Sequence, residues 1–110
     1  MSDLIGSGAG DNLKAAFEVQ DGERSRVTGA LDFTTVSALL GAGVAVIKQG
    51  RAAVIDLTGV TSSDSSGLAL LIEWLSEAKA AECTLRYVNV PSQLHQLARL
   101  SEVEELLVPG

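Results

Sequence analysis

Aromatic side chains are scarce in this 110-residue sequence, at 4% of its residues, and cysteine occurs once. Because the hydrophobic fraction is nevertheless 46%, the core has to be aliphatic, which is typical of helices packed on a sheet. The lone Cys83 excludes an internal disulfide and a cysteine-based zinc site. The length fits a single domain.

Basic residues are also few, since eight Lys and Arg stand against 14 Asp and Glu for a net charge of −6. They are scattered along the chain, which argues against nucleic-acid binding and against direct docking on anionic lipid headgroups. No apolar run approaches the ~20 residues of a membrane span, and the start of the chain lacks the features of a signal peptide. We therefore expect a cytoplasmic protein.

Residues 1–12 alternate glycine with small residues and are expected to form a flexible leader to a domain at 13–110. Gly6, Gly8 and Gly10 are spaced as in some phosphate-binding loops. Such a loop follows a strand and opens a helix, whereas this segment stands at the start of the chain. We interpret it as a linker.

Strands are predicted where short apolar or alternating runs are bounded by turn residues. Four segments fit this description: residues 14–20, 24–31, 52–57 and 84–88. An Asp-Gly pair lies between the first two and is a strong signal for a hairpin. The third segment is almost wholly apolar, which is typical of a strand buried on both faces. Residues 58–65, which follow it, are predicted to form a polar turn.

Helices are predicted where apolar residues recur every three or four positions. The predicted helices extend from Thr34 or Thr35 to Ile47, from Ser66 to Ala81 and onward from Pro91-Ser92, with a last short helix at Glu102–Leu107. Gly41 and Gly43 weaken the first of them, and Gly50 is expected to end it. The order ββαβαβα, with right-handed crossovers between the later strands, predicts an α/β fold with a small, mostly parallel mixed sheet of about four strands.

The helix predicted at 66–81 is the strongest in the chain. A turn of about 100° per residue places one apolar stripe on the sheet side, formed by Leu68, Leu71, Ile72, Leu75 and Ala78. Leu70 and Trp74 fall on the flank or outer face as an i, i+4 pair. Two interpretations remain open: Trp74 lies sideways over the neighbouring helix, or it forms a partner-binding strip with Ser66 and Leu70.

The turn before this helix is rich in polar residues. Asp64, Ser65 and Ser66 are all good N-cap residues, and Gly67 permits another group to approach the backbone closely. A helix N-terminus also attracts phosphate and acidic groups. The turn therefore is either a cap alone or a cap that also meets a ligand or partner.

Enzymatic activity is not expected from these residues. His95 is the only histidine, and no nucleophile-elbow, Walker or metal-ligand spacing is present. Asp56 and Asp64 are a conceivable carboxylate pair, but Asp56 ends a buried strand and is better explained as a residue that bonds a turn. We expect no catalytic residue, no metal and no cofactor.

Residues 56–68, which contain the run Asp-Ser-Ser-Gly-Leu, closely resemble the signature of STAS domains, the fold of anti-sigma factor antagonists. Residues 28–32 resemble the Gly-Glu-Leu-Asp strand end of that family, with Ala30 in place of the Glu, so any role of that Glu is in doubt here. The resemblance covers about residues 14–108. It implies a STAS fold for the domain at 13–110.

Residues 30–36, 67–75 and 90–94 look like the STAS subunit of Mla phospholipid-transport systems. This resemblance implies an accessory subunit that binds the cytoplasmic ATPase of an ABC transporter, and through it the permease, at the inner membrane of a Gram-negative bacterium. Such a system moves phospholipids between the two membranes and maintains outer-membrane lipid asymmetry. The residues Leu70, Ile72, Glu73 and Trp74 favour this branch of the family.

The other branch is an anti-sigma factor antagonist, whose partner is an anti-sigma kinase. The resemblance implies that Ser65 is the phospho-acceptor in that branch and a contact with the ATPase in the first. Together with the helix geometry, it predicts a partner-binding surface formed by Asp32, Thr34, Asp64, Ser66, Gly67, Leu70 and Trp74.

Overall fold

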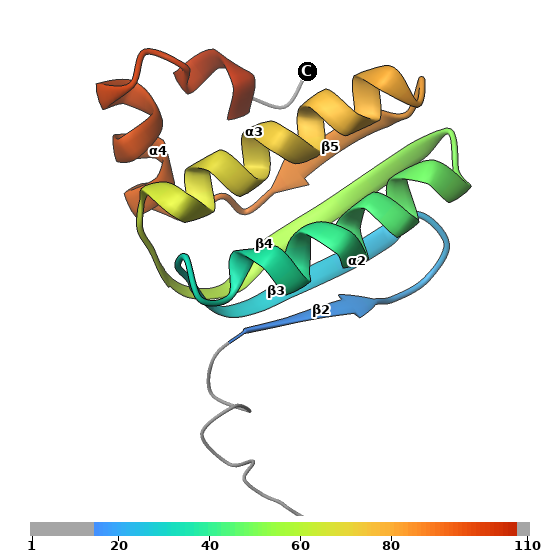
Figure 1. The fold of residues 1–110 in the computed structure, drawn as a ribbon, viewed down its shortest axis with the longest axis horizontal. Helices are drawn as coiled ribbons and strands as arrows, with labels where there is room; N and C mark the ends of the chain where they lie inside the picture. The colour runs from blue at the N-terminus through green and yellow to red at the C-terminus, as the bar shows by residue number, and fades with distance from the viewer. Residues whose placement is uncertain (1–14, 108–110) are drawn as a thin grey trace, which may run out of the picture.

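Four strands and three helices make up the computed structural model, which describes residues 15–107 (Figure 1). The strands are β2 (Ala15–Val19), β3 (Arg24–Leu31), β4 (Ala52–Ser63) and β5 (Thr84–Val88). The helices are α2 (Val36–Gln49), α3 (Ser65–Ala80) and α4 (Ser92–Leu100), and a 3-10 helix, η1, spans Glu104–Leu107. The leader predicted at residues 1–12 lies outside the described residues.

The strands form one sheet in the order β2-β3-β4-β5. β2 and β3 are antiparallel, whereas β3 pairs with β4 and β4 with β5 in parallel. The predicted hairpin turn is closed by two backbone hydrogen bonds between its ends, and Gly22 adopts a φ of 56° there. The predicted mixed, mostly parallel sheet of four strands in the order ββαβαβα is confirmed.

The turn predicted at residues 58–65 is wrong, because β4 continues to Ser63. Its polar second half pairs with the end of β3, from Thr28 opposite Gly59 to Leu31 opposite Ser63, and two register shifts accommodate the extra residues. Thr58, Thr61 and Ser62 remain exposed. The backbone pairing with β3, rather than burial of side chains, therefore holds this segment extended.

The helices agree with their predictions to within a few residues. α2 ends at Gly50, as expected, and α3 begins one residue before the predicted start. The predicted last helix is the shorter 3-10 helix η1. Among the described helices, none combines the length and apolar character needed to cross a bilayer.

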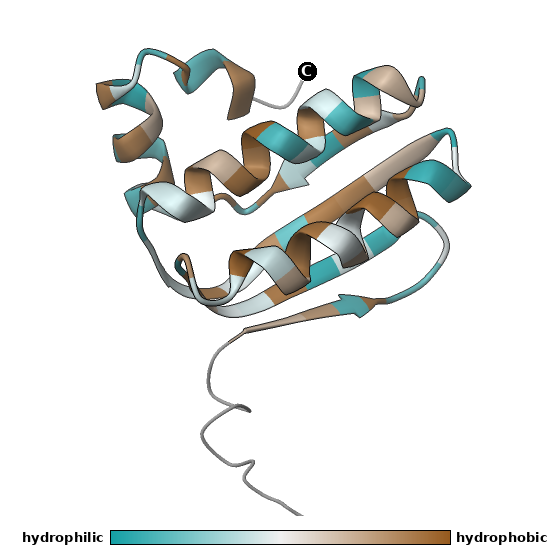
Figure 2. Ribbon diagram, viewed as in Figure 1, coloured by the Kyte–Doolittle hydropathy of each residue, from teal (hydrophilic) through white to brown (hydrophobic). Residues whose placement is uncertain are grey.

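α2 and α3 lie side by side on one face of the sheet, and α4 packs against α3 and the end of β4 (Figure 1). The hydrophobic first half of β4 lies beneath the two helices (Figure 2). Tyr87 on β5 shows which face this is, because its hydroxyl donates a 2.6 Å hydrogen bond to the Leu71 carbonyl of α3. Ile55 lies beside Tyr87 in the register and is fully buried.

Asp56 projects from the opposite face of β4 and is buried despite its charge. Its carboxylate accepts hydrogen bonds from the Thr58 hydroxyl at 2.6 Å and the Thr58 N–H at 2.9 Å. The side chains of Asn89 and Arg24 each donate a further hydrogen bond to it, at 3.1 Å. These bonds, with that of the Thr58 hydroxyl the largest, hold the pKa of Asp56 well below its ordinary value, although burial acts in the opposite direction.

Asp56→Asn is therefore expected to destabilise the protein most at neutral pH and progressively less below about pH 4. Because the pKa is lower in the folded state, the carboxylate contributes stability that is complete above its unfolded pKa and is lost as the pH falls through the folded one. Urea unfolding at a series of pH values measures this difference. Asp21→Asn, in the exposed hairpin turn, is the control. A deficit that does not change with pH would contradict the expectation.

Candidate functional site

The segments predicted to bind a partner meet where two parallel strands end. Asp32 directly follows β3 and Asp64 directly follows β4, whose last residues pair with each other. The Asp64 N–H donates a 3.1 Å hydrogen bond to the Leu31 carbonyl. The sheet thus brings together two loops that lie about thirty positions apart in the sequence. Each loop leads directly into a helix, α2 or α3.

Asp64, one of the three predicted cap candidates, is the N-cap of α3. Its Oδ1 accepts a 2.7 Å hydrogen bond from the Ser66 N–H, and its carbonyl accepts one from the Gly67 N–H at 3.0 Å. Ser65 is the first residue of the helix, and both Asp64 and Ser65 are exposed, with Ser66 half-buried. The cap therefore leaves the side of the turn that carries Ser65 open to a partner.

Gly67 is buried against the ends of both parallel strands. A Cβ at this position would overlap the Ser63 hydroxyl and lie 2.8 Å from the Leu31 Cβ. The close approach predicted for Gly67 is thus to the protein's own strands. It positions the first turn of α3, and with it Ser65 and Ser66, at the C-terminal ends of β3 and β4.

The loop before α2 has its own hydrogen-bonded turn. Asp32 accepts bonds from the Thr34 N–H at 2.9 Å and the Thr34 hydroxyl at 2.6 Å. Thr35 occupies the N-cap position of α2, but its hydroxyl donates to the Ala30 carbonyl at 3.0 Å and accepts from the Asp32 N–H. The bonds hold this loop in shape and leave Thr34 exposed at its tip.

Two residues of this region were not among the predicted site residues. Phe33 is 77% exposed in the loop before α2, and Gln93 of α4 accepts a 2.9 Å hydrogen bond from the Ser63 N–H. Phe33 is one of only two phenylalanines in the chain, but nothing in its sequence neighbourhood shows that it is exposed. The Gln93 contact spans 30 positions and has no local signal.

Leu70 and Trp74 lie off the sheet-facing stripe of α3, on a flank, as predicted, but they do not form an exposed partner-binding strip. Leu70 is 4% exposed and Trp74 is fully buried. The indole N–H donates a 3.1 Å hydrogen bond to the Leu40 carbonyl of α2, and the ring makes an edge-to-face contact with Phe17. Of the two interpretations, the structure supports the one in which Trp74 covers the neighbouring helix. The ring is not accessible to a partner.

The remaining titratable candidates do not assemble into a catalytic group. Asp56 is engaged by Thr58, Asn89 and Arg24 on the far face of the sheet, so it does not pair with Asp64. His95 lies half-buried on α4 and makes no hydrogen bond to a serine within residues 15–107. The same part of the chain contains no cluster of acidic, His and Cys side chains able to hold a metal.

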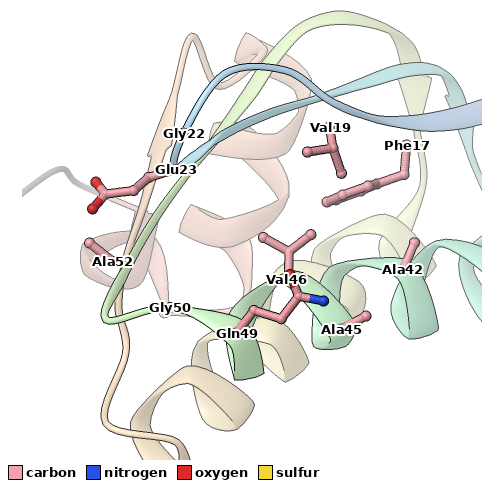
Figure 3. A pocket seen from close by; sticks show the side chains of 10 residues that line it. All are labelled: Phe17, Val19, Gly22, Glu23, Ala42, Ala45, Val46, Gln49, Gly50 and Ala52. Carbon is pink, nitrogen blue, oxygen red and sulfur yellow. The ribbon is translucent and has the colours of Figure 1, made fainter.

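A hollow lies away from this site, between β2 and the C-terminal half of α2 (Figure 3). It has a volume of about 400 Å³. Phe17 and Val19 of β2 face Val46 of α2 across it, whereas the Glu23 carboxylate points away (Figure 3). Its lining offers no nucleophile with a neighbouring base.

A family model described as "Mlab, STAS domain" matches residues 17–109 of the chain. The chain belongs to the STAS domain family. The match extends over both loops of the candidate site and all the described helices. No curated protein matches the sequence.

Solved STAS structures superpose on this fold. An anti-sigma factor antagonist from Mycobacterium paratuberculosis aligns with a TM-score of 0.73 at 24% identity, over 86% of this chain and 83% of that one. The anti-sigma factor antagonist SpoIIAA in its unphosphorylated form aligns with a TM-score of 0.66 at 18% identity, over 87% of each chain. A chain of the Acinetobacter MlaFEDB complex in an ATP-bound conformation aligns with a TM-score of 0.68 at 25% identity, over 79% of this chain and 95% of that one.

Proposed function

We propose that this STAS domain is a non-catalytic accessory subunit that binds the cytoplasmic ATPase of an Mla-type ABC transporter, and through it the permease. The likeness to a chain of the Acinetobacter MlaFEDB complex, over 95% of that chain, carries the proposal. In this role the protein is cytoplasmic and held at the inner membrane by the transporter, which moves phospholipids and maintains outer-membrane lipid asymmetry.

The geometry of the site supports docking rather than chemistry. Ser65 and Thr34 are exposed at neighbouring loop ends, on backbone that Asp64 and Asp32 hold rigid through their own hydrogen bonds. A rigid exposed surface loses little conformational entropy when it binds. We propose Ser65, with Asp64, Ser66, Asp32 and Thr34, as the contact surface for the ATPase, with Gly67, Leu70 and Trp74 supporting it from within.

The second candidate is an anti-sigma factor antagonist, which the likeness to SpoIIAA and to the mycobacterial protein supports. In this case an anti-sigma kinase would transfer the terminal phosphoryl group of ATP to the exposed Ser65 hydroxyl, releasing ADP and the hydroxyl proton. The phosphate would add about −1.5 to −2 charges beside Asp64. The added charge would alter docking on this face.

Affinity purification from the source bacterium separates the two candidates. A tagged wild-type chain is expected to retain an ATPase subunit with Walker motifs together with its permease. Recovery of an anti-sigma kinase instead, with no transporter subunit, would overturn the proposal in favour of the second candidate. Mass spectrometry of the same sample reports whether Ser65 carries phosphate.

Ser65→Tyr is expected to weaken binding of the purified ATPase subunit at least tenfold, because a large neutral side chain at the first position of α3 blocks close approach. The change places no atom in the core, so the melting temperature is expected to stay near that of the wild type. Ser76→Tyr is the matched control, since Ser76 is exposed further along the same helix. Equal affinities of the two variants, measured by calorimetry, would show that Ser65 is only part of the cap.

A further inference from the structure

A groove of about 330 Å³ lies between the N-terminal halves of α2 and α3. Val36 and Leu40 line it from α2, and Leu70, itself only 4% exposed, lines it from α3. Ser66 and Ala69 form part of its rim. Because the rim residues are small and the lining is apolar, one side chain of a partner can enter the groove. Side chains of one helix pack between those of another in the same way.

The groove is continuous with the proposed docking surface. Ser66 belongs both to the rim and to the turn that carries Ser65. Phe33, 77% exposed, lies three positions before Val36 in the loop that leads into α2. Exposed aromatic residues are enriched in protein–protein interfaces, so this loop is suited to extend the docking surface.

The charged residues on the groove lining and on the loops that lead into α2 and α3 have a single sign. The sequence contains no Lys or Arg between Val27 and Ile47 or between Ala52 and Ala78. The exposed Glu73 lines the groove, and Asp64 and Asp32 lie at the adjoining loops. The lysines of the two helices, Lys48 and Lys79, lie in their last turns, at the opposite end. This end of the molecule is therefore complementary to a basic surface.

We infer that the groove receives one apolar side chain from a basic segment of the ATPase, with Glu73 facing a Lys or Arg of that segment. This inference rests on the proposed function and specifies the chemistry of the partner. The apolar side chain supplies the buried contact, and the acidic rim attracts the segment and sets its orientation. Binding should weaken as salt is raised, because exposed charges are screened over about 10 Å at 0.1 M ionic strength.

Two pairs of variants test the inference by calorimetry with the purified ATPase subunit. Ala69→Phe fills the groove and is expected to weaken binding at least tenfold, whereas Ala80→Phe, on an exposed site at the end of the same helix, is expected to leave it unchanged. Glu73→Lys is expected to weaken binding and to remove part of its salt dependence. Glu105→Lys, an equal charge change on the exposed face of η1, is its control.

Each outcome bears on one of the two proposals. If the wild type does not bind the ATPase, the proposed function fails and the inference falls with it. If the wild type binds and Ala69→Phe binds equally well, only the inference fails. Tighter binding by Glu73→Lys would mean an acidic partner and would also overturn it. A free wild-type dimer that Ala69→Phe makes monomeric, by analytical ultracentrifugation, would assign the groove to a second copy instead.

Discussion

Trp74→Ala is expected to lower the free energy of unfolding by about 3–5 kcal/mol, as deletion of a fully buried aromatic side chain does. The substitution empties the space between α2 and α3, removes the bond to the Leu40 carbonyl and ends the contact with Phe17. For a domain of this size the melting temperature falls by more than about 10 °C. A loss of this size approaches the whole free energy of unfolding that is typical of small domains.

Urea unfolding followed by far-UV circular dichroism measures this loss, since the variant has no tryptophan fluorescence to follow. Trp74→Phe is the matched control: it keeps a ring in the core and removes the indole N–H, so a smaller loss is expected. An unchanged stability of Trp74→Ala, accompanied by weaker partner binding, would mean that the side chain lies on the surface after all.

Gly43→Ala and Gly41→Ala are expected to change stability in opposite directions, although they lie two residues apart on α2. A Cβ on Gly43 would overlap the indole ring of Trp74, and such overpacking costs about 1–3 kcal/mol. A Cβ on Gly41 meets nothing within 4 Å, so the variant gains the better helix propensity of alanine, up to about 1 kcal/mol.

A double-mutant cycle shows whether the indole is the cause. In a Trp74→Ala background the obstructing ring is gone, and Gly43→Ala is expected to lose its cost, whereas the gain from Gly41→Ala should persist. Chemical unfolding of the single and double variants gives the coupling energy. Two glycine variants with the same effect would contradict the packing of α2 on Trp74.

Local signals in the sequence were sufficient for most of the fold. The hairpin at Gly22, the start of α3 after Asp64 and the end of α2 at Gly50 depend on residues a few positions apart, and each lies within one residue of its prediction. The role of Gly43 in α2, in contrast, could not be predicted from local signals. Gly43 weakens a helix taken alone, but here it makes room for the indole of a neighbouring helix.

In the candidate site, too, local features could be predicted and contacts between distant segments could not. The cap formed by Asp64 and the close approach at Gly67 could be predicted because a helix start has a recognisable sequence pattern. The contact of Gln93 with Ser63 and the exposure of Phe33 could not, because each depends on where a distant segment packs. The groove between α2 and α3 likewise exists only because two helices far apart in sequence lie side by side.

By itself, the sequence determined the class of fold, the order of its elements and the capped turn at Asp64, because apolar periodicity and turn residues act over short distances. Tertiary structure decided the length of β4 and the place of Trp74. The polar residues after Leu57 become a strand only because β3 offers them backbone partners. Trp74 lies off the sheet-facing stripe of α3, but α2 covers the flank on which it lies. A helix that packs beside another helix on a sheet therefore buries a second side, and the periodicity of its own sequence does not show that side.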